Sequence, residues 1–222
     1  GQGDTFFMSV FDGVQTVLSR HHLDLVAMLC SSDEDADDYL RRMVSRGFAD
    51  GIIISSIRRV DPRITFLAEH NVPFAMLGRS MTDAGQPWLD LDFETMARQA
   101  VNRLVAHGHR RIAITVPHND VNLGYVFREA AERTLREHGL TLDPKLVISS
   151  TPNESGGYGI ALELLAQTPR PTAVILVNES ISTGLYRGLS EANYLPGRDI
   201  AVIGRDSPQT RFLSPTLTGF RQ

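Results

Sequence analysis

The chain has 222 residues, 42% hydrophobic and 22% charged, a balance that is ordinary for a folded globular protein and excludes a disordered one. Its formal net charge of −4 argues against a surface that holds nucleic acid by itself, since such surfaces usually carry a basic stripe. The apolar runs are far shorter than the roughly 18 to 20 residues that span a bilayer, so we expect no membrane segment.

Helix-like and strand-like segments alternate along the chain, which predicts an α/β fold with parallel sheets flanked by helices. Apolar spacing and caps predict helices at residues 6–19, from Ser32 through Met43, and at 62–70, 93–106, 123–138, 154–167 and 179–193. Short β-branched runs predict strands at residues 23–30, 50–55, 72–77, 88–91, 111–116, 145–149, 172–177 and 199–203. The rhythm indicates two similar lobes that divide near Leu91, with a binding cleft between them.

The single cysteine, Cys30, rules out an internal disulfide. It ends the apolar run at residues 25–30, so we expect it to be a small buried hydrophobe in a strand. A cytoplasmic location fits this cysteine usage.

Motifs for catalysis, nucleotides and metals are weak or missing in the sequence. Gly1 and Gly3 begin like a dinucleotide fingerprint, but Phe6 occupies the third glycine position. His107 and His109 have no companion pair at a metal-ligand spacing, and no nucleophile elbow can be identified. The sequence therefore predicts no enzyme, no metal site and no cofactor.

Polar residues follow several apolar strands at the point where each strand ends. Arg79, Asp92, Asn178 and Asp206 hold such positions, and Asp206 closes the segment D-I-A-V-I-G-R-D. Each one alone is readily explained as a cap or turn residue. Four at equivalent ends favour a polar ligand, because ligands of open α/β sheets bind outside the carboxyl ends of the strands.

Several segments in a fixed order carry a resemblance to a known family. They are D-G-I-I-I from Asp50, V-P-F-A-M-L-G-R from Val72, L-D-L-D from Leu89, L-V-A-H-G-H-R-R-I-A from Leu104, E-S-G-G-Y from Glu154, V-N-E-S from Val177, P-G-R-D-I-A-V-I-G-R-D from Pro196, and S-P-T-L-T from Ser214. With the helix that begins at Phe6, they cover almost the whole chain. The chain resembles the effector-binding core of the lactose/galactose repressor family of bacterial transcription regulators.

The resemblance implies a two-lobed, periplasmic-binding-protein-like fold with a small sugar-like effector between the lobes. Residues 1–91 would form the N-terminal lobe without its first strand, 92–215 the C-terminal lobe, and 216–222 the start of a crossover back. It also implies a homodimer that holds operator DNA through an N-terminal helix-turn-helix domain outside this chain. The effector-binding positions carried over are Phe7, Arg79, Asp92, Tyr125, Asn178 and Asp206.

Three positions depart from the family's pattern. Tyr125 stands where many members have an arginine, Gly78 replaces an aspartate, and Arg205 replaces an aromatic residue. Arg205 would either pair with Asp206 or turn outward. Residues 61–70 and the ending Gly78-Arg79 are similar to the α-glucoside-regulator branch, which favours a glucoside or another sugar.

Two other functions remain open from the sequence. The chain could be a periplasmic sugar-binding protein of a transport system, which a signal peptide before Gly1 would establish. It could also be an α/β enzyme working in the same cleft, which would require turnover of a ligand. The absence of a readable pair of nucleophile and base counts against the enzyme.

Overall fold

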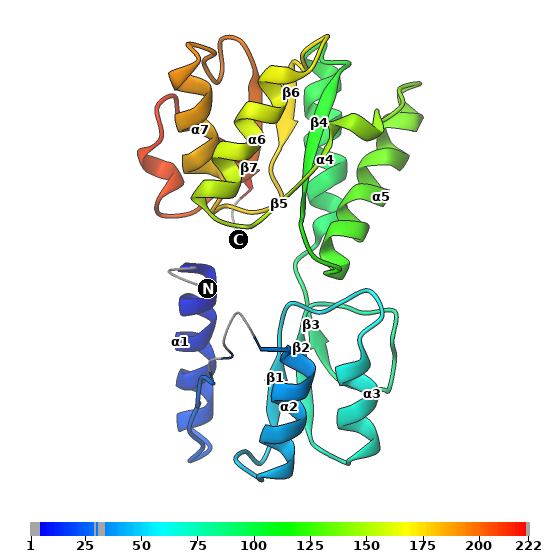
Figure 1. Ribbon diagram of the computed structural model, residues 1–222, viewed down its shortest axis with the longest axis vertical. Coiled ribbons are helices and arrows are strands. Elements are labelled where there is room, and N and C mark those ends of the chain that lie inside the picture. Colours follow the sequence, from blue (N-terminus) through cyan, green and yellow to red (C-terminus); the bar gives the residue numbers. More distant parts are fainter. Residues whose placement is uncertain (1–4, 29, 31–33, 221–222) are drawn as a thin grey trace. The chain divides into compact units, whose positions relative to one another are not determined.

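The computed structural model describes residues 5–28, 30 and 34–220 (Figure 1). The chain forms two compact units, residues 1–50 and 51–222. The first unit contains helices α1 (Thr5–Ser19) and α2 (Ala36–Ser45). The carboxylate of Asp35 caps α2 by accepting hydrogen bonds from the backbone N–H groups of Asp37 and Asp38. The predicted start of this helix at Ser32 lies outside the described residues.

The strand predicted at residues 23–30 is wrong, because residues 23–28 and 30 have no strand pairing. The N–H of Leu25 instead donates to the side-chain oxygen of Gln15 over 2.9 Å, a bond to α1 that takes the place of a ladder bond. Cys30 is exposed, so its predicted burial is also wrong. An apolar run forms a strand only where another strand supplies partners for its backbone groups.

The second unit contains two parallel sheets among its described residues. In the smaller one the order is β1 (Ile52–Ile54), β2 (Phe74–Leu77) and β3 (Trp88–Leu89), and α3 (Pro62–Glu69) connects β1 to β2. In the larger one the order is β5-β4-β6-β7-β8, and every neighbouring pair is parallel. The elements of this larger part are α4 (Phe93–Ala106), β4 (Ile112–Pro117), α5 (Asn122–Glu137), β5 (Val147–Ser150), α6 (Glu154–Ala166), β6 (Ala173–Ile175), α7 (Ser182–Glu191), β7 (Ala201–Arg205) and β8 (Thr218–Phe220).

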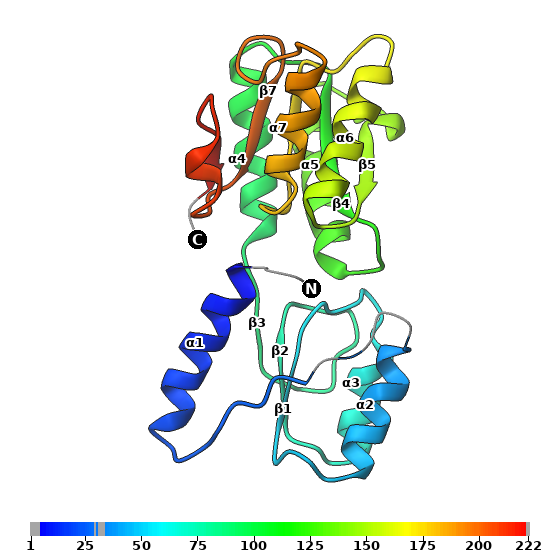
Figure 2. The same ribbon diagram turned by 60° about the vertical axis from the view of Figure 1, so that its left-hand side comes forward.

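The strand order of the larger sheet fixes which face each helix covers. The chain moves from β4 to β5 in one direction and from β5 through β6 to β7 in the other. Since parallel crossovers are right-handed, α5 covers one face while α6 and α7 cover the opposite face. Helix α4 packs against α5, and α6 packs against α7 (Figures 1 and 2). The order therefore reverses at β4, which places a topological switch point between β4 and β6.

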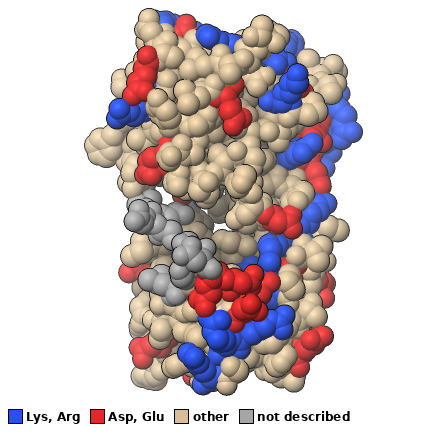
Figure 3. Space-filling model, in the orientation of Figure 1, with Lys and Arg blue, Asp and Glu red and all other residues tan. Residues whose placement is uncertain are grey.

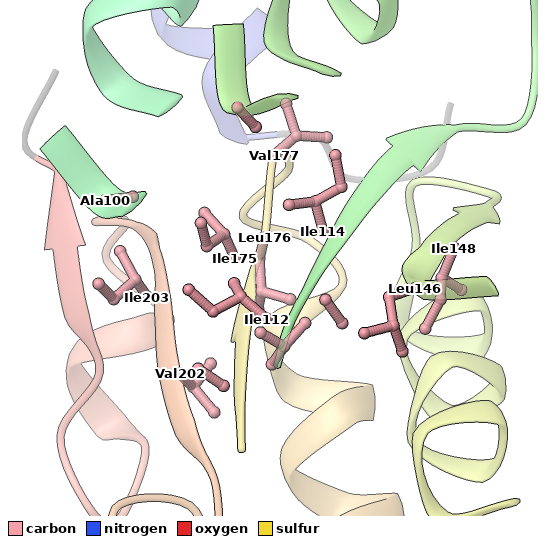
Figure 4. Packing of buried hydrophobic residues seen from close by; sticks show 14 of the residues in the cluster. Ala100, Ile112, Ile114, Leu146, Ile148, Ile175, Leu176, Val177, Val202 and Ile203 are labelled. Carbon is pink, nitrogen blue, oxygen red and sulfur yellow. The ribbon is translucent and has the colours of Figure 1, made fainter. Parts of the chain in front are cut away.

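The core of the larger part lies between this sheet and its helices. Ile112 and Ile114 of β4, Ile175 of β6 and Ile203 of β7 are almost completely buried, and Figure 4 shows them with their neighbours. A strand buried on both faces needs apolar residues in succession, which explains the continuous runs in the sequence. The larger sheet is thus held by apolar packing on both of its faces.

Apart from the strand at residues 23–30, the predicted elements are confirmed, with differences at their ends. Helix α7 begins at Ser182 rather than Glu179, since residues 179–181 form a turn in which the N–H of Ser182 donates to the Glu179 carbonyl. The strand β8 was missed, because its sequence T-G-F has no apolar run. It exists through its parallel pairing with β7.

Glycines let α6 and α7 approach closely. A Cβ built on Gly184 would overlap the carbonyl oxygen of Glu154, and one on Gly157 would overlap that of Ile181. Gly159 of α6, in contrast, has nothing within 4 Å of the place a Cβ would take. Gly157, within E-S-G-G-Y, therefore serves helix packing, whereas Gly159, just after this segment, is free to change.

We predict that Gly184→Ala lowers the free energy of unfolding by about 3 kcal/mol, because backbone atoms of two helices must separate to admit the methyl group. Gly159→Ala is the matched control, and it should raise stability by about 0.5–1 kcal/mol, as is usual inside a helix. Urea unfolding of both variants measures the difference. Equal stability of the two variants would contradict the packing described here.

Candidate functional site

Asp206 stands directly after β7, as its sequence position predicts. Its N–H donates to the carbonyl of Phe220 over 2.7 Å, which extends the β7–β8 pairing by one bond. Its half-buried carboxylate lies 3.2 Å from Nη2 of Arg211, which follows in the 3₁₀ turn at Thr210–Phe212. The carboxylate is thus fixed at the carboxyl edge of the larger sheet, and the prediction of a strand-tip aspartate is confirmed.

Asn178 lies beyond the end of β6, next to the switch point. The buried hydroxyl of Thr115 in β4 accepts a hydrogen bond from the N–H of Val177 over 3.0 Å, which continues the contact between β4 and β6 after β6 has ended. Ile175 pairs with Ile203, so Asn178 and Asp206 each stand three residues beyond a registered pair. Both therefore come to the same edge on neighbouring strands.

Arg205 turns into the protein, so the outward orientation, one of the two expected alternatives, is wrong. It is 4% exposed, and its Nη1 lies 2.9 Å from Oε2 of Glu179, whose side chain is 9% exposed. Asp206, one of the two expected alternatives as a partner, lies 3.2 Å from Nη2 of Arg211. Arg205 shares a face of β7 with Ile203, since side chains alternate along a strand, and its guanidinium carbon lies 5.9 Å from the ring centre of Phe93 in α4.

Asp92 is the N-cap of α4. Its carboxylate accepts a hydrogen bond from the N–H of Thr95 over 2.9 Å, and its side chain is exposed. The hydrogen bonds from Thr95 hold the pKa of Asp92 below its ordinary value, and the positive charges of Arg79 and Arg98 act in the same direction. Asp92 thus has a structural role as a cap, and its exposed carboxylate is ionised at neutral pH.

Arg79 follows β2 and pairs with Asp90, with 3.2 Å between Nε and Oδ2. Burial raises the pKa of Asp90 against the opposing effect of Arg79. The guanidinium of Arg79 also lies over the ring of Trp88 at 5.7 Å. Gly78, just before it, has a φ of 122°, and a Cβ placed there would lie 3.1 Å from Cγ1 of Ile57, so a residue with a side chain would be strained here.

Tyr125 lies in the first part of α5, and both its hydroxyl and its ring are engaged. The hydroxyl donates to Oδ1 of Asp120, and this hydrogen bond raises the pKa of Tyr125. The guanidinium carbon of Arg59 lies 4.7 Å from the ring centre, and Arg59 also pairs with Glu129 at 2.9 Å. One face of the ring is therefore covered by a cation.

The loop that carries Arg59 is held by a fully buried carboxylate, Asp61. Asp61 accepts from the backbone N–H of Arg58 over 2.9 Å and from Nη2 of Arg63 over 2.6 Å. Burial by itself raises the pKa of Asp61, but the hydrogen bonds from Arg63 and Arg58 outweigh it and hold this pKa below its ordinary value of 3.8. The ion pair thus stabilises the loop that meets α5.

Phe7 belongs to the first unit and is half-buried in α1. Its ring packs edge-on against Phe6 at 5.5 Å and lies 6.3 Å from Phe11. These aromatic contacts are local to the helix.

Two groups of sequence-predicted residues therefore emerge in the second unit. Arg79 and Tyr125 form the first group, at the start of α5. Tyr125 belongs to this helix, and the side-chain amide of Asn122 donates to the Arg79 carbonyl over 2.9 Å. Asn178 and Asp206 lie at the ends of β6 and β7. Sequence reasoning missed Thr115, which accepts the hydrogen bond from Val177. The one available signal was a hydroxyl group within an otherwise apolar strand.

The chemistry available at the ends of β6 and β7 is hydrogen bonding to a polar ligand. Asn178 offers an amide that donates and accepts, and Asp206 offers a carboxylate that accepts. Within the described ranges, no group of three or more His, Cys, Asp or Glu residues could hold a metal ion. Across the same ranges, no helix has the length and apolar character needed to cross a membrane. On the face drawn in Figure 3, basic side chains are interspersed with acidic ones.

The chain was compared with known proteins. Residues 2–209 match the family described as periplasmic binding proteins and sugar binding domain of the LacI family. The chain belongs to this family. The expected resemblance and the α/β fold are both confirmed.

Named transcriptional regulators are similar to this chain. The transcriptional regulator RafR of Escherichia coli is 33% identical over 89% of this chain, and AglR of Rhizobium meliloti is 31% identical over 79%. The chain spans 58% and 50% of their respective lengths. The structure of a transcriptional regulator CelR–cellobiose complex is 28% identical, covers 92% of this chain and 63% of that one, and superposes with a TM-score of 0.79.

We predict that Thr115→Val costs about 1–3 kcal/mol of stability, because the buried N–H of Val177 loses its acceptor. Thr134→Val is the matched control: Thr134 is also buried, but its hydroxyl only donates to the Ala130 carbonyl within α5. Chemical denaturation measures both. A Thr134→Val variant as unstable as Thr115→Val would contradict the assigned role.

We also predict a pH-dependent cost for Asp61→Asn. A carboxylate with a lowered pKa in the folded state stabilises the fold above the pKa of the unfolded chain, and this contribution is lost as pH falls through the folded value. The difference in the free energy of unfolding between parent and variant should therefore be largest at pH 7 and decrease below pH 3.8. Asp83→Asn, in an exposed turn, should change stability by no more than about 0.5 kcal/mol at pH 7.

Proposed function

We propose that this chain is the effector-binding and dimerisation core of a DNA-binding transcriptional regulator, a repressor that responds to a sugar or glucoside. The observation that carries the ligand site is the placement of Asn178 and Asp206 at corresponding positions beyond β6 and β7. These residues stand beside the switch point of the larger sheet, where ligands of such sheets bind. The proposal includes no catalysis and a cytoplasmic location.

The similar proteins support a regulator rather than a transport protein. RafR and AglR are both named as transcriptional regulators, and the CelR structure is titled as a complex with cellobiose. From this similarity we infer that this chain also binds a sugar and acts on operator DNA. The operator would be held by a helix-turn-helix domain outside these residues, in a homodimer.

Asn178 and Asp206 would bind ligand hydroxyls, because each hydroxyl taken from water must regain its hydrogen bonds. The other proposed pocket positions are Phe7, Arg79, Asp92 and Tyr125. Phe7 or Tyr125 would supply an apolar face for a sugar ring. The lobes would be residues 1–91 and 92–215, with residues 216–222 beginning the return crossover.

Regulation would work through differential affinity. A sugar that contacts both lobes favours one arrangement of them, and only the difference in affinity between arrangements can change DNA binding. The sugar would thereby shift the regulator's affinity for its operator.

We predict that at least one sugar from a panel of cellobiose, maltose, sucrose and ribose stabilises the chain against heat. A ligand present at about 100 times its dissociation constant adds about 2.7 kcal/mol to the free energy of unfolding. Asn178→Ala and Asp206→Ala should both remove this shift. Differential scanning fluorimetry with and without each sugar measures it.

Asp143→Ala is the control, since Asp143 is also paired with an arginine but follows α5 and precedes β5, at the amino edge of the sheet. It should keep the full sugar-dependent shift. If Asp206→Ala and Asn178→Ala respond to sugar as strongly as the parent, the proposed site is wrong.

A further inference from the structure

Three buried side chains meet behind the ends of β6 and β7, and we call Phe93, Glu179 and Arg205 the arginine cluster. Arg205 Nη1 lies 2.9 Å from Glu179 Oε2, and the two side chains are 5% and 9% exposed. The guanidinium carbon lies 5.9 Å from the ring centre of Phe93, which begins α4. A full pair of charges has thus been taken out of water at the edge of an apolar core.

Each member of the arginine cluster is the direct sequence neighbour of one polar residue of the proposed ligand site. Asp206 follows Arg205 directly, and Asn178 directly precedes Glu179. Phe93 likewise follows Asp92. We call these three exposed or half-buried polar neighbours, Asp92, Asn178 and Asp206, the rim residues.

The cluster therefore joins three segments that are far apart in sequence. Neighbouring strands lie about 4.8 Å apart, but β6 ends at Ile175, so strand pairing alone does not hold the backbone at Asn178. The Arg205–Glu179 contact spans the gap beyond the end of β6. Both charges are buried, so water cannot replace either partner when the pair separates. Separation is therefore unfavourable, and the contact has few alternative geometries.

We propose that the arginine cluster is a positioning device for ligand binding, which fixes the spacing of Asn178 and Asp206 and their placement relative to Asp92. This rests on the proposed function of those residues. Arg205 and Glu179 touch no ligand in this proposal; they act through the rim residues. The specificity for one arrangement of sugar hydroxyls follows from the fixed spacing.

The competing explanation is that the pair only stabilises the fold. Buried ion pairs are poor stabilisers: replacing both partners by apolar residues is often neutral or stabilising, whereas removing one partner leaves an uncompensated charge. A doubly apolar variant consequently separates the two explanations. It can restore stability without restoring the geometry at the rim.

The experiment compares Arg205→Met, Glu179→Met and the double variant Arg205→Met/Glu179→Met. Melting temperature is measured without ligand, and the dissociation constant is measured by calorimetry with whichever of cellobiose, maltose, sucrose and ribose stabilises the parent chain most. Each single variant should melt about 10 °C below the parent. The double variant should recover most of that loss, yet bind the sugar about tenfold more weakly than the parent.

A double variant that recovers its melting temperature and also binds like the parent overturns the proposal. If the double variant does not fold, Arg205→Lys decides, because lysine keeps the charge but not the planar guanidinium geometry. Weakened binding at a melting temperature near the parent's supports positioning, and parental binding overturns it.

The control is Arg128→Met/Glu132→Met, which removes a 2.7 Å ion pair on the surface of α5. It should leave the dissociation constant unchanged. Asn178→Ala and Asp206→Ala are measured in the same series. If they bind like the parent, the proposed site fails; if they lose binding while the doubly apolar variant keeps it, only the positioning role fails.

Discussion

The parallel register between β6 and β7 determines what can happen at the carboxyl edge of the larger sheet. Ile175 pairs with Ile203, and this match brings Asn178 and Asp206 to corresponding positions on neighbouring segments. A shift by one residue would exchange the faces of β7 and turn Arg205 away from Phe93. The apolar residues of both strands resist such a shift, since their side chains fill the core on the two faces of the sheet.

Buried polar side chains connect neighbouring segments of this core beyond the point where strand pairing ends. The hydroxyl of Thr115 accepts from the N–H of Val177 just after β6 ends, and Arg205 meets Glu179 two residues further on. The hydrogen bond satisfies a buried N–H, and the ion pair places two opposite buried charges next to each other. Side-chain contacts order this edge of the sheet. Asn178 and Asp206 can therefore lose little conformational freedom when a ligand binds.

The start of α5 provides a second place where distant segments meet. Arg59 lies over the ring of Tyr125, while the buried carboxylate of Asp61 holds the loop from which Arg59 projects. The cation that covers the ring of Tyr125 thus comes from a segment outside α5.

The sequence by itself determined the α/β rhythm, most of the helices and strands, the cap at Asp92, and the family, because these depend on neighbouring residues or on short motifs. It also placed Asp206 at a strand tip. Tertiary structure decided the partner of Arg205, the bond of Thr115, the exposure of Cys30 and the existence of β8. Each of these depends on a group supplied, or not supplied, by a segment elsewhere in the chain, and local periodicity carries no information about such a partner.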